Sequence, residues 1–349
     1  MTDGNLNLSA DKLQELEHVL LNTSGNTSLA QRFRALFTLK AVGKSDLRVI
    51  DIIGKGFDDQ SALLKHELAY VLGQLRHTQA LPILGSVLQD LSQDPMVRHE
   101  AAEAIGAISQ PESLPLLEEY MNRPGEHREV RETCEIAVDK IRWDWGAGKE
   151  RKDNRDADDS QFTSEDPAPP LAVEDPNAAI TAESKRVSDA DIEILRKTLV
   201  DPSLPLFTRY RAMFSLRNLS PTHPAAIYAL ASAFTTSEPS ALFKHEVAFI
   251  FGQILSPLSV PALIRVLEDE GENEMVRHEA AEALGGIATD DCLPVLRKWM
   301  AKEDAPQVVK ESCVVAIDMW EYENSGEFQY ANALVNNAEP VPKEQAVLA

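Results

Sequence analysis

Cysteine is scarce in this chain of 349 residues: Cys134, Cys292 and Cys313 are too few and too scattered for a disulfide framework. No apolar run reaches the roughly 18 residues that a membrane-spanning helix requires. The first twelve residues are polar and mildly acidic, without the basic and then apolar pattern of a secretory signal. These absences predict a reduced, cytoplasmic protein, with a nuclear pool left open.

Basic residues are in the minority, because 34 lysines and arginines stand against 56 aspartates and glutamates, for a net charge of −22. A nucleic-acid-binding protein normally carries a basic face, so this composition disfavours that class. An acidic protein attracts cationic partners, although the charge can equally serve solubility alone. With 44% hydrophobic residues, the chain is long enough and apolar enough for two domains, each with its own core.

What the chain does contain is an internal duplication. Residues 65–74 match residues 244–253, and residues 97–106 match residues 276–285, almost position by position. The same interval of 179 residues separates the two members of each pair. The second half of the chain is therefore a copy of the first.

A shorter repeat of 33 residues lies inside each half, where it separates His66 from His99 and His245 from His278. Related segments follow one step further in each direction, so each half holds four repeats. Apolar residues recur at steps of three and four, as in residues 101–108, which is the spacing of a helix. Two helices per repeat predict an all-α solenoid of eight helix pairs in two duplicated lobes, resembling HEAT-like repeats.

A change in composition separates the two halves. Residues 146–184 are rich in acidic residues and proline, and they bury too little apolar surface to offset the entropy lost on ordering. We expect an N-terminal lobe over residues 1–145, a flexible linker over 146–184, a C-terminal lobe over 185–324 and a weakly ordered tail over 325–349.

The dipeptide His-Glu occurs four times, always in the two central repeats of a half. Its members are His66, Glu67, His99, Glu100, His245, Glu246, His278 and Glu279. If repeat packing alone preserved the dipeptide, the outer repeats would carry it too, but they have Phe33, Glu132, Tyr210 and Glu311 in place of the histidine.

Imidazole nitrogens and carboxylate oxygens suit iron and other first-row metals, and the lack of cysteine here argues against a thiolate zinc site. Adjacent repeats of a solenoid present equivalent residues side by side. The pattern therefore predicts one metal ion in each half, and two facing halves would give a dinuclear centre.

A glycine follows each motif histidine at the seventh position, whereas the outer repeats have other residues there. The four are Gly73, Gly106, Gly252 and Gly285. Glycine inside a helix costs about 1 kcal/mol relative to alanine, so its presence needs a reason. One interpretation is that the glycines leave room for oxygen and a substrate chain, which makes Gly73 and Gly252 substrate-binding candidates. The other is close packing between helices, or a helix end.

On these residues the sequence resembles the deoxyhypusine hydroxylase (deoxyhypusine monooxygenase) family, over roughly Leu13 to Glu323. The resemblance implies a non-haem centre of two iron ions that activates dioxygen. It also implies hydroxylation of the deoxyhypusine side chain of eukaryotic translation initiation factor 5A, which completes hypusine. The eight motif residues are the implied ligand candidates, and the electron donor is left unidentified.

Two bridged octahedral irons need fewer than eight protein ligands. We expect the direct ligands to be the four histidines with Glu100 and Glu279. Glu67 and Glu246 would then face the substrate amine, which a carboxylate-lined cleft would attract and orient. Glu103 and Glu282, one helical turn beyond His99 and His278, either support the ligands through hydrogen bonds or are ordinary exposed glutamates.

Three other functions fit parts of the pattern. A non-catalytic helical-repeat scaffold would bind proteins in its groove, but it would not confine His-Glu and glycine to the central repeats. A lyase that attaches bilin chromophores uses similar repeats without needing four matched pairs. A dinuclear metallohydrolase would use the same ligands, and only the family resemblance argues against it.

Overall fold

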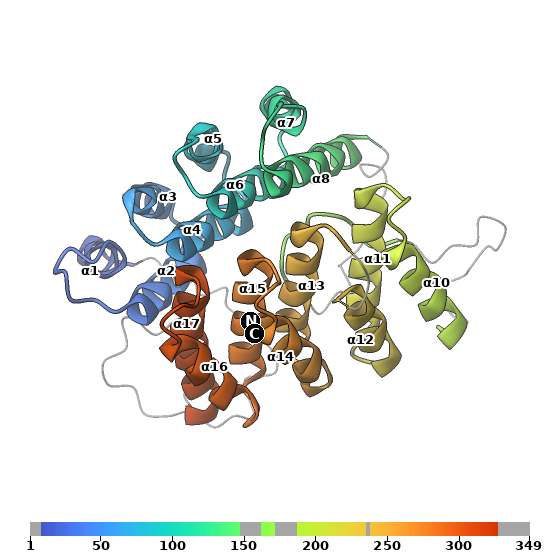
Figure 1. Cartoon of the computed structure of the whole chain (residues 1–349). Helices are drawn as coiled ribbons and strands as arrows, with labels where there is room; N and C mark the ends of the chain where they lie inside the picture. The colour runs from blue at the N-terminus through green and yellow to red at the C-terminus, as the bar shows by residue number, and fades with distance from the viewer. Residues whose placement is uncertain (1–7, 147–161, 172–186, 235–237, 327–349) are drawn as a thin grey trace, which may run out of the picture.

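Every regular element in the described part of the chain is a helix, and the helices form eight consecutive pairs (Figure 1). The computed structural model describes residues 8–146, 162–171, 187–234 and 238–326. The all-α solenoid of eight helix pairs that the repeats predict is confirmed. None of the described helices combines the length and the hydropathy needed to cross a membrane.

Four pairs make up each lobe. In the N-terminal lobe they are α1 (Ala10–Leu20) with α2 (Leu29–Gly43), α3 (Arg48–Gly54) with α4 (Ala62–Leu75), α5 (Leu81–Gln89) with α6 (Pro95–Ile108), and α7 (Leu114–Met121) with α8 (Arg128–Trp145). In the C-terminal lobe they are α10 (Asp189–Val200) with α11 (Leu206–Leu219), α12 (Pro224–Ala231) with α13 (Ala241–Ile254), α14 (Val260–Glu268) with α15 (Glu274–Ile287), and α16 (Cys292–Ala301) with α17 (Gln307–Ser325). Short 3₁₀ turns precede or follow several of them: η1 (Lys55–Asp58), η2 (Thr78–Ala80), η3 (Pro111–Ser113), η4 (Ser232–Phe234) and η5 (Pro257–Ser259).

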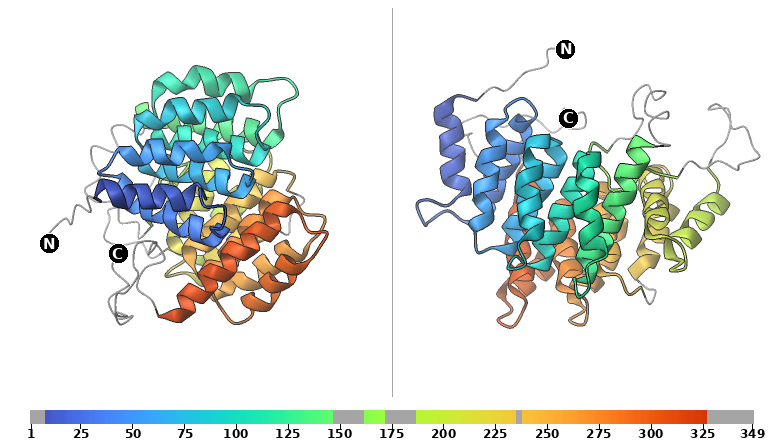
Figure 2. Two further views of the ribbon diagram at one scale, coloured as in Figure 1. Left: turned by 90° about the vertical axis from the view of Figure 1, so that its left-hand side faces the viewer. Right: turned by 90° about the horizontal axis from the view of Figure 1, so that it is seen from above.

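The second helix of each pair lies on the inner face of its lobe, so two rows of inner helices face each other (Figures 1 and 2). At one end α17 contacts α2 and α4, and at the other end α8 contacts α11 and α13. The last helix of each lobe thus meets the beginning of the other lobe. This head-to-tail arrangement brings the central repeats of both lobes together in the middle.

The four central inner helices begin and end in the same way. Polar side chains cap α4, α6, α13 and α15 by accepting a hydrogen bond from a first-turn backbone N–H: Ser61, Asp94, Ser240 and Asn273. Each helix stops at a residue in the left-handed conformation: Arg76, Ser109, Leu255 and Ala288. Each motif histidine is the fifth residue of its helix, so these caps place all four histidines at the same distance from the start of their helices.

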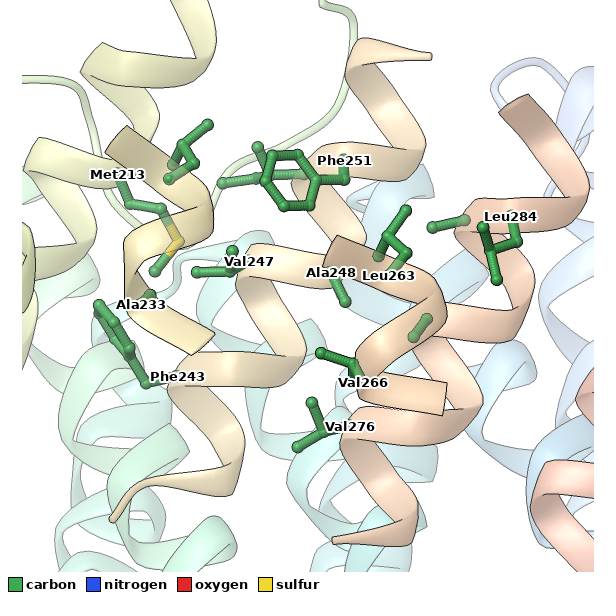
Figure 3. Packing of buried hydrophobic residues seen from close by; sticks show 14 of the residues in the cluster. Met213, Ala233, Phe243, Val247, Ala248, Phe251, Leu263, Val266, Val276 and Leu284 are labelled. Atoms are coloured by element: carbon green, nitrogen blue, oxygen red, sulfur yellow. The ribbon is translucent and has the colours of Figure 1, made fainter. Parts of the chain in front are cut away.

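Buried apolar side chains hold the helix pairs together within each lobe, as Figure 3 shows for residues of the C-terminal lobe such as Phe243, Phe251 and Leu284. Each such side chain contributes about 1.5–3 kcal/mol when fully buried. Arginines add a polar tie, because the Nε–H groups of Arg98 and Arg277 donate to the last-turn carbonyls of the preceding outer helices. The lobes are therefore rigid supports for the residues on their inner faces.

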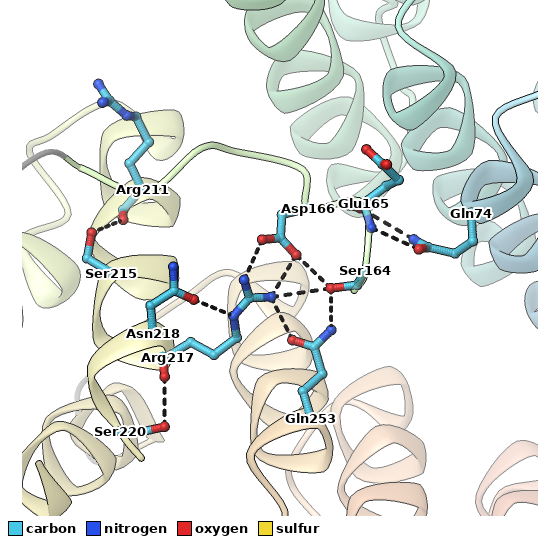
Figure 4. A network of polar contacts seen from close by, with 10 residues as sticks. All are labelled: Gln74, Ser164, Glu165, Asp166, Arg211, Ser215, Arg217, Asn218, Ser220 and Gln253. Atoms are coloured by element: carbon cyan, nitrogen blue, oxygen red, sulfur yellow. Dashed lines mark hydrogen bonds and ion pairs between the residues drawn. The ribbon is translucent and has the colours of Figure 1, made fainter. Parts of the chain in front are cut away.

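Part of the predicted linker is packed, and the expectation of a flexible stretch is wrong for residues 162–171, which we call the strap (Figure 4). Asp166 of the strap accepts hydrogen bonds of 2.7 and 2.5 Å from the guanidinium of Arg217. The backbone of Glu165 exchanges two hydrogen bonds with the side chain of Gln74, and Ala168 is fully buried. Residues 147–161 and 172–184 of the predicted linker, and residues 327–349 of the predicted tail, lie outside the described residues.

Candidate metal centre

The four motif histidines converge from four helices and from both lobes. The ring centroid of His66 lies 5.3 Å from that of His99 in the same lobe. It lies 5.2 Å from the ring of His278 and 5.7 Å from that of His245, which belong to the other lobe. Residues that are up to 212 positions apart in the chain thus form one cluster between the lobes.

These imidazoles are buried and have no hydrogen-bond partner within the described residues. The four histidines are at most 5% exposed, and both ring nitrogens of each make no hydrogen bond. A buried polar atom left without a partner costs about 1–3 kcal/mol, so eight such nitrogens in one place need an explanation. A bound metal ion would provide one, because a neutral imidazole nitrogen is a common metal ligand.

Carboxylates from neighbouring repeats complete the cluster. The Nε2 atom of His66 lies 3.3 Å from a carboxylate oxygen of Glu100, and that of His245 lies 3.4 Å from Glu279. Burial disfavours a charged His66, but the carboxylates of Glu100, Glu67 and Glu279 together outweigh burial, so the pKa of His66 is raised to about 9. Each close pair joins a histidine of one repeat to a glutamate of the next within the same lobe.

Two sets of ligand atoms lie near enough to hold a metal ion, with all atoms of a set within 4.8 Å of one another. One comprises His66, His99 and Glu100, and the other comprises His66, His245 and His278. The first set belongs to one lobe, as the repeat pattern predicts, whereas the second joins the two lobes. Nitrogen and oxygen donors without sulfur match the preference of iron and other first-row metals.

The ionisation of the cluster also points to a missing positive charge. Burial raises the pKa of the Glu67 carboxyl to about 8, and neighbouring carboxylates add to the shift. Burial also raises the pKa of Glu246 well above its usual range, again with support from other carboxylates. The pKa of His99 and that of His278 are lowered by burial and by the other imidazoles. A divalent cation in their midst would reverse this balance, because it favours carboxylates and neutral imidazoles.

A cavity of about 350 Å³ opens beside the histidines. Its acidic lining consists of Glu67, Glu100, Glu103, Glu246, Glu279, Glu282 and Glu323, and its apolar lining includes Phe37, Tyr70, Phe249, Leu255 and Met319. The rings of Tyr70 and Phe249 meet edge to face at 5.7 Å between their centroids. Such a volume suits a small molecule or a single long side chain, and its carboxylates suit a cationic one.

The chain is similar to a repeat family and to several relatives that all carry the same name. Residues 50–139 and 229–318 match the family model for HEAT repeats. The deoxyhypusine hydroxylase of Lentinula edodes is 55% identical over 96% of this chain and 99% of its own length. That of Candida albicans is 49% identical over 95% and 99%, and that of Drosophila melanogaster is 50% identical over 94% and 97%.

The chain belongs to the deoxyhypusine hydroxylase family. A solved structure of human deoxyhypusine hydroxylase in complex with glycerol agrees, with 43% sequence identity and a TM-score of 0.75. The similarity covers 89% of this chain and 96% of the human chain. Family and fold thus rest on nearly the whole length of the protein.

In the structure of the present chain, all eight motif residues lie at the interface between the lobes. All four motif glutamates line the cavity, and among them Glu100 and Glu279 form the ion pairs with imidazoles. The division into direct ligands and substrate-facing carboxylates is compatible with these positions and stays a prediction.

Two further glutamates, Glu103 and Glu282, also belong to the site. Glu282 lies 3.5 Å from the Nδ1 atom of His278 and accepts a hydrogen bond of 3.0 Å from Ser312. Glu103 lines the cavity, and burial raises its pKa well above the usual range. Neither glutamate is exposed, so their interpretation as ordinary surface residues of the repeat is wrong.

The glycines mostly serve helix packing. A Cβ atom added to Gly73 would lie 2.8 Å from the Cα of Ala104, and one added to Gly285 would lie 2.6 Å from the Cα of Ala316. Gly106 meets the next inner helix in the same way. The expectation that these glycines leave room for a substrate chain is therefore wrong for Gly73, whereas Gly252 does line the cavity.

The sequence reasoning missed the aromatic wall of the cavity. Tyr70 and Phe249 each follow a motif histidine by four positions, which places them on the same helix face as the histidine. A matched aromatic residue at that step in α4 and α13 is the signal that would have found them. Lys40 was missed too, and its ammonium group lies 4.6 Å from the centre of the Tyr70 ring.

Proposed function

We propose that this chain hydroxylates the deoxyhypusine side chain of eukaryotic translation initiation factor 5A, using two iron ions and dioxygen. The observation that carries the proposal is the convergence of eight imidazole nitrogens, none of them hydrogen-bonded within the described residues, from both lobes beside an acidic cavity. Family membership supports the same substrate, because the relatives bear the name of that reaction.

The residues that would hold the irons are the four motif histidines with Glu100 and Glu279. Their donor atoms are nitrogen and oxygen only, they are buried, and no described protein group satisfies the imidazoles. The two irons, when bound, would supply the chemistry that activates dioxygen for insertion into a carbon–hydrogen bond. The contribution of the protein is to place one carbon of the substrate next to them.

The lining of the cavity would bind and orient the substrate. Glu67 and Glu246 are buried carboxylates that can accept hydrogen bonds from an ammonium group and so fix the far end of a long aliphatic chain. Tyr70 and Phe249 form an apolar wall that suits the methylene groups and excludes water from them. Holding a reactive carbon in one place is worth several kcal/mol of activation free energy.

The direct test supplies the purified protein with ferrous iron, a reductant and translation initiation factor 5A carrying deoxyhypusine. Under isotopically labelled dioxygen, mass spectrometry should show one labelled oxygen atom on the modified lysine and none under argon. A protein that binds metal and cleaves a bond with water, without adding oxygen to the side chain, would favour the metallohydrolase alternative. A protein that binds the factor but carries no metal and adds no oxygen would favour the scaffold.

A further inference from the structure

The internal duplication gives the groove between the lobes two halves that are related by the interval of 179 residues. One half is the cavity described above, and Phe37 of α2, Met319 of α17 and Leu255 at the end of α13 line its outer part. The equivalent residues of the other half are Phe214, Lys140 and Arg76, because the first repeats of the two halves are 177 residues apart and the other repeats 179. We call these the open half and the strapped half.

The strap occupies the second half. It spans both lobes by binding a pair of glutamines that are equivalent under the duplication, Gln74 and Gln253 (Figure 4). The side-chain amide of Gln253 donates to the hydroxyl of Ser164 over 2.8 Å, and the Glu165 N–H donates to Gln74 over 2.9 Å. In the open half, by contrast, no described segment crosses between the lobes.

Little space remains beneath the strap. Between Glu103, Gly106, Lys140 and Pro167 there is a void of only about 10 Å³, roughly the room of one water molecule. On the outer side of the strap lies a depression of about 380 Å³, but none of the eight motif residues lines it. The strap therefore separates the outer depression from the histidine cluster.

The two copies differ at the positions that hold the strap. Arg217 stands where the first half has Lys40, and its guanidinium, 1% exposed, is paired with Asp166 of the strap. Arg76 stands where the second half has Leu255, and it forms an ion pair of 3.0 Å with Glu165. At the position where the strapped half has this cation, the open half has an apolar residue, Leu255, which is 53% exposed.

We propose that the strap closes one of two equivalent entrances, so that substrate and small molecules reach the histidine cluster only through the open half. This inference rests on the proposed function for the identity of what enters. The two halves also use equivalent cations differently, because Lys40 lies over the ring of Tyr70 in the open half whereas Arg217 is paired with Asp166 of the strap.

Matched cysteine variants test the two entrances. Leu255→Cys and Arg76→Cys introduce a thiol at equivalent positions of the open and the strapped half, while Cys134, Cys292 and Cys313 are buried and poorly reactive. Each variant is loaded with ferrous iron and labelled with a bulky maleimide. The readout is the rate at which the chelator 2,2′-bipyridine extracts the iron, compared between labelled and unlabelled protein.

The label at position 255 should slow iron extraction and substrate turnover by roughly tenfold or more, because it blocks the open half. The label at position 76 should change both rates by less than about twofold, because the strap already closes that half. Replacing residues 162–171 with a glycine–serine segment of equal length should restore extraction from the protein labelled at position 255. Equal slowing by both labels would overturn the inference.

A readout without metal separates this inference from the proposed function. In the metal-free protein, the amides of Glu165 and Leu171 donate to Gln74 and to the Arg211 carbonyl, so they should exchange slowly with deuterium. Arg217→Ala, which removes the guanidinium that pairs with Asp166, should speed that exchange. If both amides exchanged at the rate of an unstructured peptide in the unaltered protein, the strap would not close the groove. A protein that took up no iron would contradict the proposed function alone.

Discussion

At the scale of single residues, the motif histidines are set apart from the other four by burial and by the lack of partners. His77 contacts the carbonyl of Gly43 and His223 contacts Thr222, whereas the motif imidazoles form no hydrogen bond within the described residues and lie beside one another and beside carboxylates. We expect His66→Ala and His245→Ala, and likewise the alanine variants of the other two motif histidines, to lower iron content by about tenfold or more and to abolish hydroxylation.

The fold of these variants should survive, because the stability of a solenoid is mostly a sum of repeat and neighbour terms. Circular dichroism tests whether the fold survives, and iron analysis tests whether the metal is lost. His223→Ala is the control and should keep its iron and its activity. Full activity in any two of the four motif variants would show that the site has been assigned wrongly.

Acid stability depends on another residue pair, Arg98 and Glu126. Two hydrogen bonds of 2.7 Å from Arg98 hold the pKa of Glu126 below its ordinary value of 4.5. The stabilisation is complete above the pKa of the unfolded chain and is lost as the pH falls through the lower pKa of the folded state. Below about pH 4.5 the free energy of unfolding should therefore drop more steeply in the unaltered protein than in Glu126→Gln.

The same variant should lose about 1–3 kcal/mol of stability at neutral pH, measured by urea unfolding, because Arg98 would be left without its charged partner. Glu118→Gln is the matched control, since Glu118 pairs with Arg142 through side chains that are 41% and 57% exposed. An exposed pair contributes about 0–1 kcal/mol. Equal effects of the two variants would contradict the assigned role of burial.

At the scale of elements, the glycine positions show how closely the inner helices pack. Gly285→Ala should lower the free energy of unfolding by about 1–3 kcal/mol, because the new Cβ would overlap the backbone of Ala316. Gly252→Ala is the matched comparison, since the nearest atoms of Ala283 are at an ordinary 3.5 Å. It should be neutral or gain up to about 1 kcal/mol from helix propensity. Thermal unfolding of both variants shows whether these glycines are needed for close helix packing or only leave open space beside the helix.

The helices were predictable from the sequence wherever the chain repeats. The segment outside the repeats was not. The 33-residue spacing from His66 to His99 places both on equivalent helices, because the apolar pattern and the caps recur with the same period. Residues 162–171 have no period, and their acidic, proline-rich composition predicts disorder. Their order depends on Arg217 from the other lobe, and no local pattern reveals such a tertiary ion pair. The faces of α4 and α13 were predictable, but the edge-to-face contact of Tyr70 with Phe249 required the relative placement of the lobes.

At the scale of the whole molecule, the lobes meet through protein contacts and through the proposed metal centre. Polar contacts between the lobes include Ser61 with Glu311, Ser240 with Glu132, and Arg34 with Asp318. Coexpressed halves, residues 1–171 and 172–349, should therefore associate, and iron should strengthen the association because both halves contribute ligands. Size-exclusion chromatography with and without a chelator measures this effect. If each half alone bound two irons and hydroxylated the substrate, the two lobes would not share one site.

The central claim is that histidines from both lobes hold one dinuclear iron centre. The most direct measurement is elemental analysis of the purified full-length chain, together with His66→Ala and His245→Ala, one variant from each lobe. We predict two irons per chain in the unaltered protein and a loss of iron from either variant, because the clusters of ligand atoms include residues of both lobes. A chain that contains no iron, or one zinc ion in its place, would contradict the account.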